Sequence, residues 1–261
     1  MSKTSDVLKA NQTAGRGSLI GYFPAGYPTL DESVEAAIAM CKNGIDVLEL
    51  GVPYSDPVMD GLVIQQATEV ALENGFKLKQ VFDAVAAITA AVDTPVLVMT
   101  YWNPVLSYGV DKFAKELAEA GGAGLITPDL IPDEASEWLT ASDKYDLDRV
   151  FLAAPTSTSS RVKNASDLSR GFVYAVSTMG ITGTRDSVDD LAKSVVASVR
   201  NESTTQNTAV GIGISSADQV SDVNGYADGA IVGSAFIKAY SQGGISALTD
   251  KVRELAAGNS K

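Results

Sequence analysis

Eight short apolar runs recur along the chain, and most are followed by a segment with helical spacing of its apolar residues. The runs are apolar throughout rather than alternating with polar residues, which is typical of strands buried on both faces. Strands of this kind form parallel sheets whose two faces are both covered. The pattern therefore predicts an α/β fold built on a parallel sheet. The runs begin at Ser18, Asp46, Pro95, Ala123, Arg149, Phe172, Thr208 and Gly229.

Eight β-then-α units match the count of a (β/α)8, or TIM, barrel. One extra helix is expected between the second and third strands, because Leu62 to Asn74 and Leu78 to Ala91 both have helical spacing. Residues 2 to 12 are expected to add another helix across the barrel floor. No linker rich in Pro, Gly and Ser divides the sequence, so we expect residues 1–261 to form a single barrel domain.

A doubly wound open sheet is the alternative architecture. It predicts a glycine-rich phosphate loop directly after the first strand. The segment from Tyr22 to Pro28 has two prolines and a single glycine at that place. This composition favours the barrel.

The chain is acidic, with 20 Lys and Arg against 32 Asp and Glu and a net charge of −12. Such a surface repels polyphosphate, which argues against a nucleic acid or an anionic membrane as partner. No apolar run approaches the roughly 18 residues that a membrane helix needs. Residues 1–17 also lack an apolar core typical of a signal peptide, so a cytoplasmic location is expected.

Histidine is absent, and Cys41 is the single cysteine. The absence excludes Ser/His/Asp and Cys/His nucleophile arrangements and every metal site built on imidazole. One cysteine cannot form an internal disulfide. None of the predicted strands contains a lysine, which argues against Schiff-base aldolase chemistry. Carboxylates are the main acid–base groups that remain.

Glu49 lies between two leucines inside the second predicted strand, and a loop with Asp56 and Asp60 follows it. Burial raises the pKa of a glutamate, although a structural glutamate bonded to backbone N–H groups is the alternative. Aspartates in such loops most often form turns or cap helices, and Asp60 before Gly61 could be an N-cap. Reactive residues of barrels lie at the carboxyl ends of strands. Glu49 and this loop therefore form the first candidate site.

Glycine-rich turns follow the last three predicted strands. Most glycine turns only change the direction of the chain, but bare N–H groups at helix starts also bind anions. In barrels, the loops after the seventh and eighth strands are a frequent phosphate site. We therefore expect an anionic group at these turns. They are Thr182 to Thr184, Gly211 to Ser215 and Gly233 to Ser234.

The segment LELGVPYSDPVMDG, from Leu48 to Gly61, closely resembles the signature of the tryptophan synthase alpha subunit family. The similarity continues in order over essentially the whole chain. It is carried by the segments Tyr22 to Pro28, Tyr101 to Pro104, Asp129 to Pro132, Gly180 to Gly183, Gly211 to Ser215 and Gly233 to Ser234.

The resemblance implies a lyase that cleaves indole-3-glycerol phosphate to indole and glyceraldehyde 3-phosphate, with no metal and no cofactor of its own. Glu49 matches a general acid–base group that protonates the ring carbon bearing the side chain and helps to deprotonate the glycerol hydroxyl. Asp60 matches an aspartate that accepts the indole N–H and stabilises positive charge on the ring. A buried glutamate can hold a proton at neutral pH, whereas an aspartate on a polar loop stays ionised.

The resemblance also assigns substrate contacts. Thr182 would bond to Asp60 when mobile loops close, while Met179 and Pro128 depart from the family's usual residues and could alter loop closure or pocket shape. The indole pocket matches Tyr22, Tyr101, Leu152, Tyr174 and Ile212, the phosphate contacts match Gly183, Gly213, Gly233 and Ser234, and Asp129 and Gly211 are further expected substrate contacts.

A partner is implied as well: a beta subunit that receives indole through a tunnel, in an alpha2beta2 tetramer. Pyridoxal phosphate is expected only in that subunit. Channelling suits indole, which is small and apolar and would otherwise diffuse away. The expected contact residues are Pro53, Tyr54, Asp56, Pro57 and Pro132.

Two other functions stay open. One is a free-standing lyase with the same chemistry and no partner. The other is a non-catalytic regulator that binds a phosphate ligand, which the presence of both Glu49 and Asp60 disfavours.

Overall fold

The computed structural model describes residues 2–176, 185–203, 206–211 and 213–259. Three expected substrate contacts, Thr182, Gly183 and Ile212, lie outside the described residues. Met179 and the segment Gly180 to Gly183 lie outside them too.

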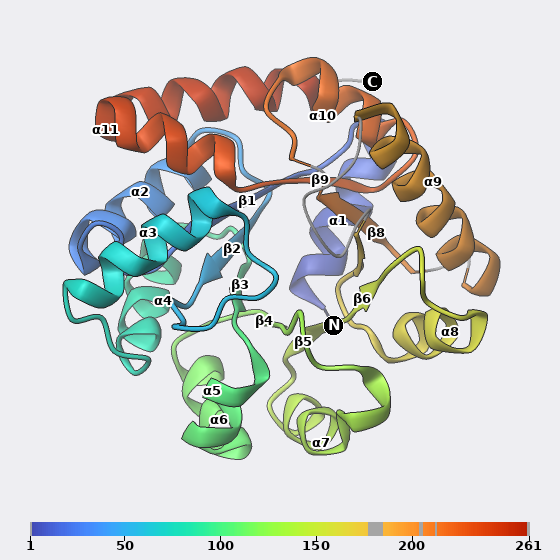
Figure 1. The fold of residues 1–261 in the computed structure, drawn as a ribbon, viewed down its shortest axis with the longest axis horizontal. Helices are drawn as coiled ribbons and strands as arrows, with labels where there is room; N and C mark the ends of the chain where they lie inside the picture. The colour runs from blue at the N-terminus through green and yellow to red at the C-terminus, as the bar shows by residue number, and fades with distance from the viewer. Residues whose placement is uncertain (1, 177–184, 204–205, 212, 260–261) are drawn as a thin grey trace.

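The described strands all pair in parallel and form a nearly closed barrel, as predicted. Their order is β5-β4-β3-β2-β1-β9-β8-β7-β6. Figure 1 shows the strands around a central axis with helices outside them. The strands are β1 Leu19–Pro24, β2 Val47–Gly51, β3 Val96–Met99, β4 Gly124–Ile126, β5 Asp148–Val150, β6 Leu152–Ala153, β7 Val173–Val176, β8 Thr208–Gly211 and β9 Gly229–Val232.

The barrel closes through the fifth predicted strand. The structure divides this run at Phe151 into β5, which pairs with β4, and β6, which pairs with β7. One continuous segment therefore contacts both neighbours, so the nine described strands correspond to the eight predicted runs.

Helices connect the strands in the expected alternation. α2 is typical: the Thr29 hydroxyl accepts the Glu32 N–H at its start (3.3 Å), and Gly44 follows its end with φ +128°. The connecting helices are α2 Leu30–Lys42, α6 Val110–Glu119, α7 Ser136–Lys144, α8 Ser159–Leu168, α9 Arg185–Glu202, α10 Ala217–Asn224 and α11 Ser234–Ala256.

Both predicted extra helices are present. α1 (Lys3–Thr13) lies across one end of the barrel (Figure 1), and α3 (Leu62–Glu73) and α4 (Gln80–Ala91) both lie between β2 and β3. The pattern of apolar residues did not predict α5 (Trp102–Tyr108), since seven residues are too short to show helical periodicity. It also missed two short 3-10 helices, η1 (Pro132–Glu134) and η2 (Ala257–Asn259).

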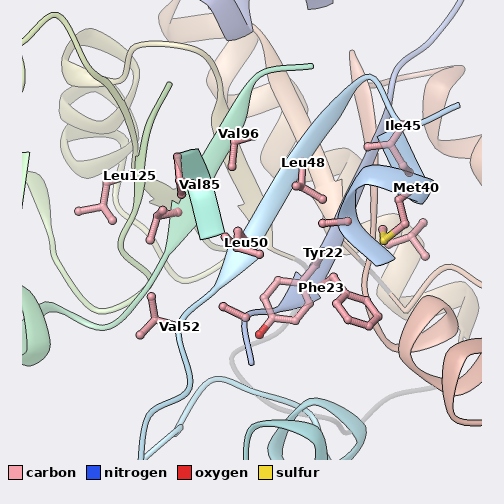
Figure 2. Packing of buried hydrophobic residues seen from close by; sticks show 14 of the residues in the cluster. Tyr22, Phe23, Met40, Ile45, Leu48, Leu50, Val52, Val85, Val96 and Leu125 are labelled. Carbon is pink, nitrogen blue, oxygen red and sulfur yellow. The ribbon is translucent and has the colours of Figure 1, made fainter. Parts of the chain in front are cut away.

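Two apolar clusters hold the barrel together. One fills its interior, where Leu8 of α1 meets inward-facing strand residues such as Val47 and Leu97. The other packs the strands against the helices, and Figure 2 shows Leu48 and Leu50 of β2 within it. Among the described helices, none has the length and apolar character needed to cross a membrane.

Candidate active site

Glu49 lies in β2 on the strand face that lines the barrel interior. Successive side chains of a strand point to opposite faces. Val47 belongs to the interior cluster, whereas Leu48 and Leu50 pack toward the helices, so Glu49 points inward with Val47. Its register partner on β1 is Tyr22. Glu49 is 1% exposed and is therefore buried in this interior.

The Glu49 carboxyl lacks a hydrogen-bond partner for one of its two oxygens, Oε1, among the described residues. The structural alternative, a glutamate held by backbone N–H groups, therefore finds no support there. Burial raises the pKa of Glu49 to about 8, in the direction that the sequence predicts. At neutral pH most of the carboxyl is protonated and can donate a proton.

The raised pKa of Glu49 also has a cost in stability. The folded chain binds the Glu49 proton more tightly than the unfolded chain does, so folding is favoured below the ordinary pKa and weakened as pH rises toward 8. Between about pH 5 and 8, the free energy of unfolding of the wild type should fall relative to Glu49→Gln by about 1.4 kcal/mol per pH unit. Urea unfolding of both proteins at pH 5.5 and 7.5 measures this difference, and a constant difference would contradict burial of a neutral carboxyl.

Asp60 lies in the loop between β2 and α3, but it does not cap that helix as the simplest interpretation predicts. The N-cap residue is Gly61, and the helix has no side-chain cap. The Tyr101 hydroxyl instead donates a hydrogen bond to the Asp60 carboxylate and accepts one from the Met59 N–H (2.8 Å). Burial raises the pKa of Asp60 to about 6, while the bond from Tyr101 lowers it. Asp60 is therefore mostly ionised at pH 7.

Three tyrosines surround the two carboxylates. Burial is the main cause that raises the pKa values of Tyr22 and Tyr174, and the charges of both Glu49 and Asp60 raise them further. Tyr101 bonds directly to Asp60. The structure thus brings together five of the residues that the sequence nominated, from β1, β2, β7 and the loops after β2 and β3.

Glycines make room for these rings. A Cβ atom on Gly51 would lie 2.2 Å from the Tyr22 hydroxyl oxygen, and one on Gly211 would lie 2.5 Å from the Tyr174 hydroxyl oxygen. A Cβ atom on Gly233 would lie 3.2 Å from the Tyr22 ring. Sequence reasoning missed Gly51, because a glycine at the end of a strand carries no signal of what packs on it.

The expected anion sites differ in how their N–H groups are used. Gly233 is the N-cap of α11 and Ser234 its first residue, and no side-chain bond caps this helix. In the turn before α10, the Ser215 N–H already has a partner, since it donates to the carboxamide oxygen of Gln219 in that helix (2.6 Å). The expectation of free N–H groups at Ser215 is therefore wrong. Gly213, in the same turn, is exposed and has φ +76°.

Two other predicted substrate contacts, Asp129 and Leu152, have partners other than Glu49 and Asp60. Both oxygens of Asp129 accept the Trp102 backbone N–H, at 2.8 and 3.1 Å. Leu152 is half-buried on β6, in register with Tyr174. Within the described residues, no group of three or more His, Cys, Asp or Glu side chains is placed to hold a metal ion.

The loop after β2 and the turn near Pro132 form part of the rim around this site. Asp56 is exposed, whereas Pro53 is buried and cannot offer the contact surface expected of it. The Tyr54 ring packs on Tyr101 with centroids 5.3 Å apart. Four large apolar side chains are exposed on this loop, the start of α3, α5 and the turn before η1. They are Val58 (80% exposed), Leu62 (67%), Leu106 (49%) and Ile131 (38%).

Comparisons with known proteins agree with the geometry. The family model described as "Tryptophan synthase alpha chain" matches residues 8–260. A tryptophan synthase alpha chain from Leifsonia xyli is 58% identical, over 99% of this chain and 98% of the relative.

Solved structures are similar along all or nearly all of the chain. A tryptophan synthase structure from Mycobacterium tuberculosis is 48% identical with a TM-score of 0.93, covering 100% of this chain and 99% of that one. A tryptophan synthase complex from Pyrococcus furiosus is 34% identical with a TM-score of 0.81, covering 92% of this chain and 98% of that one.

Proposed function

The chain belongs to the tryptophan synthase alpha chain family, and we propose that Glu49 and Asp60 carry out its reaction at the mouth of the barrel. Membership makes the chain a lyase of tryptophan biosynthesis that cleaves indole-3-glycerol phosphate to indole and glyceraldehyde 3-phosphate. One observation carries the division of roles. Glu49 is buried and mostly protonated at neutral pH, while Asp60, in the loop that follows the same strand, is mostly ionised.

The reaction begins with a proton transfer. The Glu49 carboxyl gives its proton to the ring carbon that bears the glycerol phosphate chain, and the ring becomes positively charged. The Asp60 carboxylate accepts the indole N–H and stabilises that charge. Glu49, now ionised, takes the proton of the adjacent glycerol hydroxyl. The carbon–carbon bond then breaks, its electron pair returns to the ring, and indole and the aldehyde are released.

The remaining substrate contacts follow from the barrel's shape. Tyr22, Tyr101, Tyr174 and Leu152 would line the indole pocket. The start of α11 would hold the phosphate, since its N–H groups have no side-chain cap and the helix dipole favours an anion there. Backbone donors suit a chain with a net charge of −12, because its overall field does not attract anions.

A beta subunit is the partner that the family implies. We propose that it docks on the rim formed by Tyr54, Asp56, Pro57 and Pro132. The exposed apolar side chains around this rim support the proposal, since surfaces of this kind mark protein contacts. Indole would pass to pyridoxal phosphate held in that subunit, within an alpha2beta2 tetramer in the cytoplasm. The chain itself would need no cofactor.

Indole release tests this function. The purified chain should release indole from indole-3-glycerol phosphate slowly, and a beta subunit should accelerate it. Fast release that a beta subunit does not change would instead indicate a free-standing lyase. Binding of substrate without any release, with or without the beta subunit, would leave a non-catalytic regulator.

A further inference from the structure

Asp129 lies in the loop after β4 and bonds to the start of α5. Both of its carboxylate oxygens accept the backbone N–H of Trp102, the first residue of that helix. A carboxylate at the start of a helix both satisfies a free N–H group and interacts favourably with the helix dipole. The N-cap residue, Tyr101, makes no side-chain hydrogen bond that caps this helix. Asp129 therefore fixes the backbone directly after Tyr101.

Tyr101 joins this backbone to the catalytic loop. Its hydroxyl accepts the Met59 N–H at 2.8 Å and donates to the Asp60 carboxylate. Its ring is 5% exposed and packs on Tyr54, with centroids 5.3 Å apart. The loops after β2 and β3 thus meet at one tyrosine, and Asp129 ties that tyrosine to the loop after β4.

We propose that Asp129 is a positioning residue, which acts on the reaction by holding Tyr101 against Asp60 rather than by binding the substrate. The inference rests on the proposed function and deepens it. Its carboxylate is already engaged with the Trp102 N–H, so a contact with the anionic substrate would add repulsion rather than a donor. Its effect on Asp60 passes from the Trp102 N–H through the backbone and ring of the preceding residue, Tyr101, whose hydroxyl contacts the loop at Met59, directly before Asp60.

The electrostatic surroundings of Asp60 make this role measurable. Among the described residues, Tyr22 on β1, Glu49 on β2 and Tyr174 on β7 share its site, and Tyr101 is the group whose hydrogen bond lowers the pKa of Asp60. A displaced Tyr101 no longer stabilises the charged carboxylate. The pKa of Asp60 then rises above about 6, and the ionised form that catalysis needs is lost at a higher pH.

The test compares Asp129→Ala with Asp129→Asn in the complete chain, by the pH dependence of kcat/KM for indole release. The alanine variant should move the acid limb upward by roughly half to one pH unit, with activity largely restored at about pH 7.5, below the pH at which Glu49 loses its proton. The asparagine variant keeps a carbonyl oxygen that accepts the Trp102 N–H, so its acid limb should stay near the wild-type position. Because Asp129 is exposed, neither change removes a core side chain.

A second pair of variants removes the donor instead of the acceptor. Trp102→Pro deletes the N–H that Asp129 accepts, at the first helical position, where proline is tolerated. Tyr101 has φ −69° and ψ 157°, which are backbone angles that a residue before proline adopts readily. Trp102→Ala is the matched control, which loses the same ring and keeps the N–H. Only the proline variant should shift the acid limb in the manner of Asp129→Ala.

Each outcome supports or overturns the inference. Direct substrate binding by the Asp129 charge would raise KM in both Asp129 variants with the acid limb unchanged, which would overturn it. An unshifted limb in both Asp129→Ala and Trp102→Pro, in folded and active protein, would overturn it as well. Failure of the proposed function has a different signature, since the wild-type chain would then release no indole at any pH.

Discussion

Glu49→Gln is expected to lower kcat for indole release by about 10²–10⁴-fold, the range typical of a lost general acid–base group. Glutamine keeps the size and a hydrogen-bonding end of the side chain, but it can neither donate the proton to the ring nor accept the hydroxyl proton. Because Glu49 is uncharged for most of the time at pH 7, KM should change little. Steady-state release of indole, with and without a beta subunit, measures both constants.

The matched control for this variant is Glu69→Gln. Glu69 lies exposed on α3, so the substitution makes the same chemical change away from the barrel interior. It should keep wild-type kcat and KM. A Glu49→Gln protein that released indole at a rate close to that of Glu69→Gln would refute the role of Glu49 as the proton donor.

Asp60→Asn is expected to lower kcat by about 10²–10³-fold, comparable to the loss of one preorganised electrostatic contact to a transition state. Asparagine keeps an oxygen that can accept the indole N–H, but it carries no negative charge to stabilise the cationic ring. The acid limb of the kcat/KM profile near pH 6, which reports ionisation of Asp60 in the free wild-type chain, should vanish with it. Indole release between pH 5 and 8 measures both effects.

Asp56→Asn provides the control within the same loop. Asp56 is exposed and accepts a hydrogen bond from the neighbouring Ser55 hydroxyl. Its substitution tests whether the loss of any carboxylate in this loop lowers the rate. Assayed without a beta subunit, it should retain both the rate and the acid limb. Equal losses in the two variants would indicate a general effect on the loop and count against a specific role for Asp60.

Much of the fold could be predicted from the sequence because the strands are buried on both faces and read as continuous apolar runs. The same runs located Glu49, a charged residue where only apolar side chains are expected. They did not reveal the break at Phe151, because the change of pairing partner from β4 to β7 depends on barrel closure rather than on local composition.

The detailed site depended on tertiary contacts that no local pattern encodes. Asp60 could be placed in a loop from sequence, but the bond from Tyr101, some forty residues later, and the burial that raises its pKa could not. Gly51 shows no sign in the sequence that the Tyr22 hydroxyl occupies the space of its missing side chain. The family resemblance predicted that Tyr22, Tyr101 and Tyr174 line one pocket. From residue type alone, each would have been interpreted as an ordinary core residue.

The pH dependence of kcat/KM for indole release by the wild-type chain tests most directly whether a neutral Glu49 and an ionised Asp60 act together. Activity should fall below about pH 6, where Asp60 becomes protonated, and above about pH 8, where Glu49 loses the proton it must donate. The profile should therefore be a narrow bell with its maximum near neutral pH. A rate that stays constant from pH 7 to 10 would contradict it, because a chain that works with Glu49 ionised does not use it as the acid.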